Sequence, residues 1–216
     1  LPTILWLGAK AVNNLTGLEL IPAMILLGGL SLAYSLYGGL KAVALTDVIQ
    51  VVLLIFGGLF VTYKGLDLLS EGNGLFEGFM ILQSEFPEKF DAILSYAPKE
   101  VDPEAYANYI KLPGIWVLIG GMWIAHFYYW GTNQYITQRA LGGKSLDEAQ
   151  NGLMFAGFLK IFMPIVVVLP GLIAVALEAN GTINLAGDRS NAYPSMLNLL
   201  PEGIKGLTFA ALVAAI

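Results

Sequence analysis

The sequence has 216 residues, of which 56% are hydrophobic and only 12% are charged, and it contains no cysteine. A soluble domain carries about 25% charged residues, so this chain has too little polar surface to cover a water-soluble globule of its size. The composition excludes a soluble enzyme, a disulfide scaffold and a disordered chain, and 11 basic against 16 acidic residues, a net charge of −5, argues against nucleic-acid binding.

Apolar stretches long enough to cross a bilayer recur along the chain, which predicts an all-α integral membrane protein. A helical span needs about 20 mostly apolar residues to cross about 30 Å of hydrocarbon. Four stretches meet this requirement: residues 18–40, 45–63, 114–135 and 151–177. Residues 1–13 have the pattern of the end of an earlier span, and residues 207–216 that of the start of a later one. We therefore expect the sequence to be an internal fragment of one longer transmembrane domain.

A long polar connection separates the second expected span from the third. Residues 65–113 hold nine of the sixteen acidic residues, and short helical patterns occur at residues 76–82 and 87–95. Positive charge near span ends marks the cytoplasmic side of a membrane protein. The short connections carry Lys41, Arg139 and Lys144, which favours these residues inside and the acidic connection outside.

Polar side chains at membrane depth are the candidate functional residues. An ionisable group in hydrocarbon costs at least about 2.5–3.5 kcal/mol, and the spans contain Asp47, Gln50, His126, Asn133 and Lys160. Lys160 either extends its amine to the membrane boundary or binds a polar solute. Asp47 follows an expected helix start, so it is either an N-cap on the helix dipole, which the local sequence favours, or a carboxylate at the mouth of a cation pathway.

His126, Tyr129, Trp130 and Asn133 have spacings of 3, 4 and 7, which predicts that they share one helical face. A face with aromatic rings and hydrogen-bonding groups suits a polar ring-shaped solute such as a sugar, whose C–H faces stack on aromatic rings. An interfacial aromatic belt is the other interpretation, and the spacing alone favours it. No Walker A loop, HExxH, Cys–His metal spacing or GxSxG element occurs, so we expect no enzyme activity.

Three sequence segments resemble those of the sodium:solute symporter family. The longest is the stretch Tyr129-Trp-Gly-Thr-Asn-Gln-Tyr-Ile-Thr-Gln-Arg-Ala-Leu-Gly-Gly-Lys-Ser145. The others are Tyr37-Gly-Gly-Leu-Lys41-Ala-Val with Thr46-Asp47-Val-Ile-Gln50, and Pro170-Gly-Leu after Phe158-Leu-Lys160. The likeness is closest to the bacterial sodium/galactose (glucose) symporter branch and runs from about residue 17 to the last residue.

This resemblance implies a fold and a function. The fold is a LeuT-like transporter of two inverted five-helix repeats, of which this chain would be a fragment. The function is sodium-coupled uptake of a hexose by alternating access, in a multi-pass protein of the plasma (inner) membrane. Its partners would be Na⁺ as coupling ion, a small polar solute such as a sugar, and the lipid bilayer.

The resemblance also implies roles for individual residues. Tyr129 matches the aromatic residue that closes the inner side of the sugar site, Trp130 matches the tryptophan beside it, and Lys160 matches a lysine that hydrogen-bonds sugar hydroxyls. In the sodium pathway, Asp47 matches an acidic residue linked to sodium release, and Ala215 falls where a backbone carbonyl contributes to the sodium site.

One position departs from the galactose branch, in which an asparagine that contacts sugar stands where this chain has His126. Imidazole both donates and accepts hydrogen bonds, so a sugar can still be bound with a different hydroxyl geometry. A carboxylate, amino acid or vitamin-like cargo, paired with Lys160 and His126, is an alternative within the family. A sensor or channel without coupled uptake is an alternative of another class.

Overall fold

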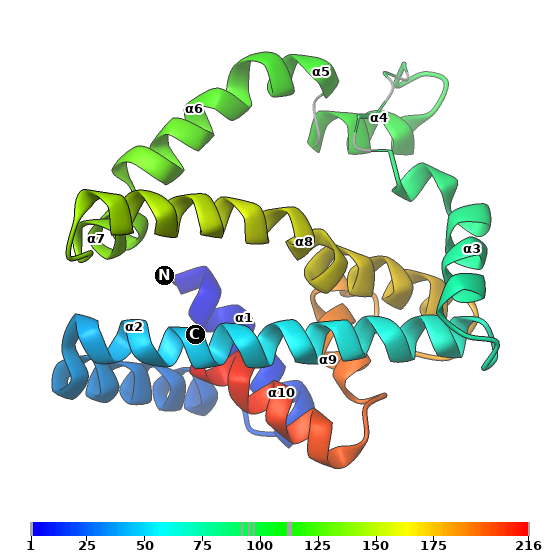
Figure 1. The fold of residues 1–216 in the computed structure, drawn as a ribbon. Helices are drawn as coiled ribbons and strands as arrows, with labels where there is room; N and C mark the ends of the chain where they lie inside the picture. The colour runs from blue at the N-terminus through cyan, green and yellow to red at the C-terminus, as the bar shows by residue number, and fades with distance from the viewer. Residues whose placement is uncertain (1, 92, 95, 97, 112–113, 216) are drawn as a thin grey trace. The chain divides into compact units, whose positions relative to one another are not determined.

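The computed structural model describes residues 2–91, 93–94, 96, 98–111 and 114–215, and within these ranges it contains helices and no strand (Figure 1). Four of its stretches are long and apolar enough to cross a membrane: Leu20–Gly39, Lys41–Leu69, Ala105–Thr132 and Leu146–Ala179. The chain divides into two compact units, one of Leu1–Glu85 with Ile161–Ile216 and the other of Phe86–Lys160. The all-helical membrane class expected from the composition is thus confirmed.

The first unit begins with α1 (Pro2–Thr16) and α2 (Leu20–Leu69), followed by α3 (Leu75–Glu85). It resumes within α8 (Leu146–Ala179) and ends with the 3₁₀ turn η4 (Arg189–Asn191), α9 (Ala192–Leu197) and α10 (Glu202–Ala214). In the polar connection, α3 covers the helical pattern expected at residues 76–82. The pattern at residues 87–95 gives only the 3₁₀ turn η1 (Pro87–Lys89), and residues 92 and 95 lie outside the described part.

A backbone break at Gly39 divides α2 into two halves. Gly39 has φ 60° and ψ −174°, a combination open almost only to glycine. Beside the break, the hydroxyl of Tyr34 contacts that of Thr46, and the Thr46 hydroxyl lies 3.1 Å from the Ala42 carbonyl oxygen. The second half is already helical from Lys41, so Asp47 lies inside a helix. The expectation that Asp47 caps a helix start is therefore wrong.

We expect Gly39→Val to destabilise the full-length protein by about 1–3 kcal/mol, because valine would be forced into a backbone region that only glycine occupies cheaply. The measurement is the thermal midpoint of unfolding in detergent. Gly29→Val is the matched control, since Gly29 lies in the same helix at an exposed position where an added Cβ meets nothing within 4 Å. Equal midpoints for the two variants would contradict the strain at Gly39.

Small residues bring α2 close to α8 and α10. An added Cβ at Gly58 would overlap a methyl group of Val166 and lie 3.0 Å from the Val166 carbonyl oxygen, and one at Gly57 would lie 2.5 Å from Thr208. The Thr62 hydroxyl is 3.0 Å from the Ile165 carbonyl oxygen on α8. Close approach of backbones over small residues, with a hydroxyl bonded across, is how membrane helices pack.

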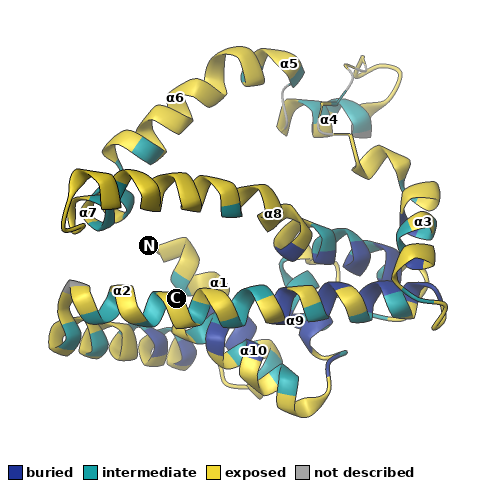
Figure 2. Cartoon of the chain, viewed as in Figure 1, coloured by how far each residue is buried: buried dark blue, intermediate teal, exposed yellow. Residues whose placement is uncertain are grey.

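The buried residues concentrate in the first unit. Figure 2 shows buried positions along the second half of α2, the C-terminal half of α8 and α9. A cluster of Ala9, Val12, Ala23 and Leu27 joins α1 to the start of α2. By contrast, α6 (Met122–Phe127) and most of the first half of α8 are exposed (Figure 2). Extended apolar surface of this kind suits contact with lipid or with further helices.

Candidate solute site

The aromatic segment of the second unit alternates between α-helical and π-helical turns. After α4 (Pro103–Lys111), it consists of α5 (Gly114–Trp116), the π turn η2 (Val117–Gly121), α6, the π turn η3 (Tyr128–Thr132) and α7 (Gln134–Leu141). A π turn widens the helix to i→i+5 hydrogen bonds and is frequent at functional sites. The regular 3.6-residue spacing assumed from the sequence is therefore interrupted twice here.

The helix ends before Asn133. This residue has φ −70° and ψ 113° and is the N-cap of α7, where its side-chain oxygen accepts a hydrogen bond from the Tyr135 backbone N–H at 3.0 Å. The expectation that Asn133 shares a helical face with His126, Tyr129 and Trp130 is therefore wrong. Its side-chain oxygen is engaged in the cap, which turns the chain from η3 into α7.

Lys160 and two aromatic rings come together into one stack. The Lys160 Nζ lies 4.3 Å from the centroid of the Tyr129 ring and 4.7 Å from that of the Trp130 ring. The two rings meet edge to face with their centroids 5.5 Å apart. A cation over aromatic faces gains about 0.5–2 kcal/mol, more when water is excluded. Of the two interpretations left open for Lys160, this geometry favours an amine directed at the aromatic residues over one extended to the membrane boundary.

An open pocket of about 330 Å³ adjoins this stack through Trp130. Its lining residues are Trp123, His126, Phe127, Trp130 and Gly131. The rings of Trp123 and Phe127 lie with centroids 6.4 Å apart. The imidazole of His126 thus lines a largely aromatic wall, with Trp130 shared between the pocket and the lysine stack. Trp123 and Phe127 were not among the candidate residues expected from the sequence, although the spacing of Trp123, Phe127 and Trp130 (i, i+4 and i+7) places all three on one side of an α-helix.

The two residues expected in a sodium pathway lie in the first unit. Asp47 is half-buried in the second half of α2, and Ala215 caps the C-terminal end of α10 with its backbone N–H 3.1 Å from the Ala211 carbonyl oxygen. The structure brings Lys160, Tyr129 and Trp130 together and sets His126 in the adjoining pocket. Asp47 and Ala215 belong to the other unit.

Comparison with known proteins gives consistent matches over the whole chain. A family model described as "Sodium:solute symporter family" matches residues 4–216. The sodium/glucose cotransporter of Vibrio parahaemolyticus is 41% identical over 100% of this chain, which covers 40% of that protein. The uncharacterized symporter YidK of Escherichia coli (strain K12) is 34% identical over 100% of the chain, covering 36% of that protein.

A human protein, sodium/myo-inositol cotransporter 2, is 30% identical over 98% of the chain, which covers 33% of it. The chain thus spans between a third and two fifths of the length of these three relatives.

Proposed function

The chain belongs to the sodium:solute symporter family, and we propose that it forms part of a transporter that couples inward sodium movement to uptake of a hexose of the glucose or galactose type. The relatives are named as cotransporters or symporters, so membrane transport, not enzyme catalysis, is the class of function. The fold we propose is the LeuT-like five-plus-five inverted repeat, in the plasma membrane.

The observation that carries the sugar proposal is the stack of Lys160 on Tyr129 and Trp130 beside the His126 pocket. A pyranose has C–H faces that pack on aromatic rings, and hydroxyl groups on its edge that need donors and acceptors. The lysine ammonium supplies three donors, and neutral imidazole supplies one donor and one acceptor. We assign substrate contact to His126, Tyr129, Trp130 and Lys160, with Tyr129 as the inner lid and Trp130 bracing it.

Names of two relatives point to ring-shaped polyols. One relative is named for glucose and another for myo-inositol. Both solutes combine a six-membered ring with a rim of hydroxyl groups, which is the shape that the stack and pocket suit. This supports a polyhydroxylated ring as cargo, and His126 would select among hydroxyl arrangements within that class.

Sodium is proposed as the coupling ion and therefore as a second cargo. A ligand shifts a conformational equilibrium only by binding one state more tightly than the other, so sodium must favour one orientation of the carrier. An inward charge gains about 2.3 kcal/mol per 100 mV of membrane potential. The Ala215 backbone carbonyl would contribute to the ion site, and Asp47 would act on the route of release to the cytoplasm.

The test is uptake of radiolabelled galactose and glucose into proteoliposomes of the full-length protein. We expect uptake to require an inward sodium gradient and to fall to background when potassium replaces sodium. If the flux of every solute is independent of sodium, the symporter mechanism is overturned, and with it the roles of Asp47 and Ala215. That result would favour a sensor or channel.

A second class of cargo fits the same site, because the Lys160 ammonium can pair with an anion. Sodium-dependent uptake of labelled galactose or glucose would then be absent, while a carboxylate, amino acid or vitamin-like compound would be carried. Competition separates the two cases. We expect unlabelled myo-inositol or glucose to reduce sodium-dependent galactose uptake, and simple carboxylates to leave it unchanged.

A further inference from the structure

Three tyrosine rings meet in the second unit, where the acidic connection leads into the aromatic segment. The ring of Tyr96 meets the ring of Tyr106 edge to face with the centroids 6.3 Å apart, and it meets the ring of Tyr109 in the same way at 5.3 Å. Tyr106 and Tyr109 are half-buried, whereas Tyr96 is 63% exposed. The three rings therefore form a cluster that is open to its surroundings on one side.

The cluster stands on one side of α4. Tyr106, Tyr109 and Ile110 are three and four positions apart, so they share one side of this helix. Ile110 is 56% exposed. Asn108 and Lys111 fall on the opposite side of the helix and are also exposed. The helix thus has an aromatic and apolar side, which with the ring packed on it we call the tyrosine surface: Tyr96, Tyr106, Tyr109 and Ile110.

Specific contacts hold α4 at both of its ends. The Asp102 carboxylate accepts a hydrogen bond from the Ala105 backbone N–H at 2.9 Å, which caps the start of the helix. At the other end, a Cβ added at Gly114 would lie 3.2 Å from a ring carbon and from the hydroxyl oxygen of Tyr109. The tyrosine surface is therefore packed directly against the start of α5.

The length of the chain places α4 at the edge of the membrane. The candidate span Ala105–Thr132 has 28 residues, whereas about 20 residues cross the hydrocarbon, a length that residues 114–132 already supply. The residues of α4 are therefore not needed for the crossing. The three residue steps from Lys111 to Gly114 reach at most about 11 Å, so the helix stays close to the layer of lipid headgroups.

The chemistry of the tyrosine surface matches that layer. A tyrosine ring has an apolar body and a polar hydroxyl, so it is most stable where hydrocarbon meets water, and tyrosine is enriched at that level of membrane proteins. The exposed side chain of Ile110 adds apolar surface on the same side. Asn108 and Lys111 give the opposite side a polar character that suits water. A helix with two such sides is suited to lie along the plane of the membrane.

We propose that the tyrosine surface binds the lipid headgroup region, with α4 lying along the membrane–water interface beside the start of the aromatic span. The partner is the bilayer itself, at the boundary between headgroups and acyl chains. The inference rests on the ring contacts, the exposure and the chain length within the second unit, and it does not depend on the proposed cargo or coupling ion.

The test is the accessibility of spin labels on the full-length protein, made free of other cysteines and reconstituted in phosphatidylcholine vesicles. Ile110→Cys carries a label on the tyrosine surface, and Asn108→Cys is the matched control on the polar side of the same helix. Oxygen concentrates in lipid, whereas a nickel chelate stays in water, so collision with each reagent reports what surrounds the label. We expect nickel collision to be about fivefold lower at position 110 than at position 108, and oxygen collision to be higher, as for a side chain about 5–10 Å inside the interface.

Equal nickel collision at the two positions would place the tyrosine surface in water and overturn the proposal. Low collision with both reagents at position 110 would show that another protein segment covers the surface, and would overturn it too. If Ile110→Cys does not fold, Tyr96→Cys carries the label on the same surface at a position that is 63% exposed, with the same expected and contrary results. No transport is measured, so a failure here leaves the proposed function standing.

Discussion

Replacing Tyr129 by alanine is expected to abolish sodium-driven sugar uptake, while phenylalanine at the same position is expected to preserve it. The ring of Tyr129 is one of the two aromatic faces beneath the Lys160 ammonium, and its edge meets Trp130. Alanine removes the ring contact with both neighbours. Each such contact contributes about 0.5–2 kcal/mol, and 1.4 kcal/mol is a factor of ten in an equilibrium.

The size of the expected effect follows from the sum of these losses. Two aromatic contacts and the stacking of the sugar itself predict a loss of about 100-fold or more in kcat/KM for uptake. Phenylalanine keeps every ring contact and loses only the hydroxyl, so uptake should stay within a few-fold of the unmodified protein. The measurement is the initial rate of labelled galactose uptake at several solute concentrations.

Tyr128→Ala is the matched control for this experiment. Tyr128 is the preceding residue in the same π turn and is 64% exposed. It lies beside the stack in sequence, so it tests whether loss of any aromatic residue at this point has the same effect. Full uptake by Tyr129→Ala, or equal losses in Tyr128→Ala and Tyr129→Ala, would show that Tyr129 is no lid.

Gly58→Leu is expected to have the largest effect on folding. Even a single Cβ at this position overlaps a Val166 methyl group and lies 3.0 Å from the Val166 carbonyl oxygen, which is backbone and cannot turn away. Pro170 has no N–H, so the Val166 carbonyl lacks its usual donor four residues on, and α2 packs at this uncovered point of α8. Leucine would force the two helices apart at the point where Thr62 bonds to Ile165.

We expect Gly58→Leu to destabilise the protein by on the order of 3 kcal/mol or more, at or above the upper end of the usual range for overpacking. The measurement is the fraction of full-length protein that elutes as a single folded species in detergent, together with its thermal midpoint. Gly29→Leu carries the same change at an exposed position of α2 where an added Cβ meets nothing. A Gly58→Leu variant as stable as Gly29→Leu would contradict the close approach of α2 and α8.

Local properties of the sequence predicted the elements but not their ends. Apolar runs mark the helices because hydrophobicity is a property of each residue and adds up along the chain. They do not mark the start of the second half of α2, since the span expected from residue 45 begins in the structure at Lys41. Asp47 was therefore placed at a helix start that lies several residues earlier.

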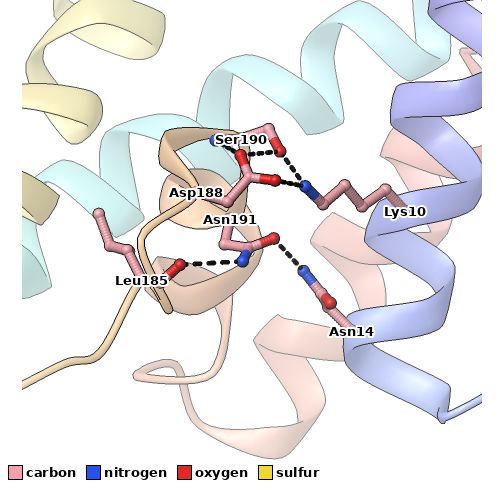
Figure 3. Close-up of polar contacts among 6 residues, drawn as sticks. All are labelled: Lys10, Asn14, Leu185, Asp188, Ser190 and Asn191. Atoms are coloured by element: carbon pink, nitrogen blue, oxygen red, sulfur yellow. Dashed lines mark hydrogen bonds and ion pairs between the residues drawn. The ribbon is translucent and has the colours of Figure 1, made fainter.

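Within the candidate site, the family resemblance is what predicted that Lys160 and Tyr129 lie together. Lys160 and Tyr129 are 31 positions apart, and the spacing of polar residues gives no reason to bring them together. The family resemblance assigns both residues to one sugar site, and the structure places the Lys160 amine over the Tyr129 ring. The contact of the Lys10 ammonium with the Asp188 carboxylate (Figure 3) had no such guide. The two residues are separated by 178 positions, and the turn at Ala186 and Gly187, which both have positive φ, brings the carboxylate to α1.

The two π turns allow the side chains of α6 to point in different directions around the helix axis. A π turn holds about one residue more than an α turn, and one residue of an α-helix corresponds to about 100° of rotation. Because η2 and η3 stand on either side of α6, converting one turn to α-helix rotates those six residues relative to the flanking segments, and the other turn absorbs the offset. The six residues of α6, which include Trp123, His126 and Phe127, can thus rotate about the helix axis while the ends of the span stay in place.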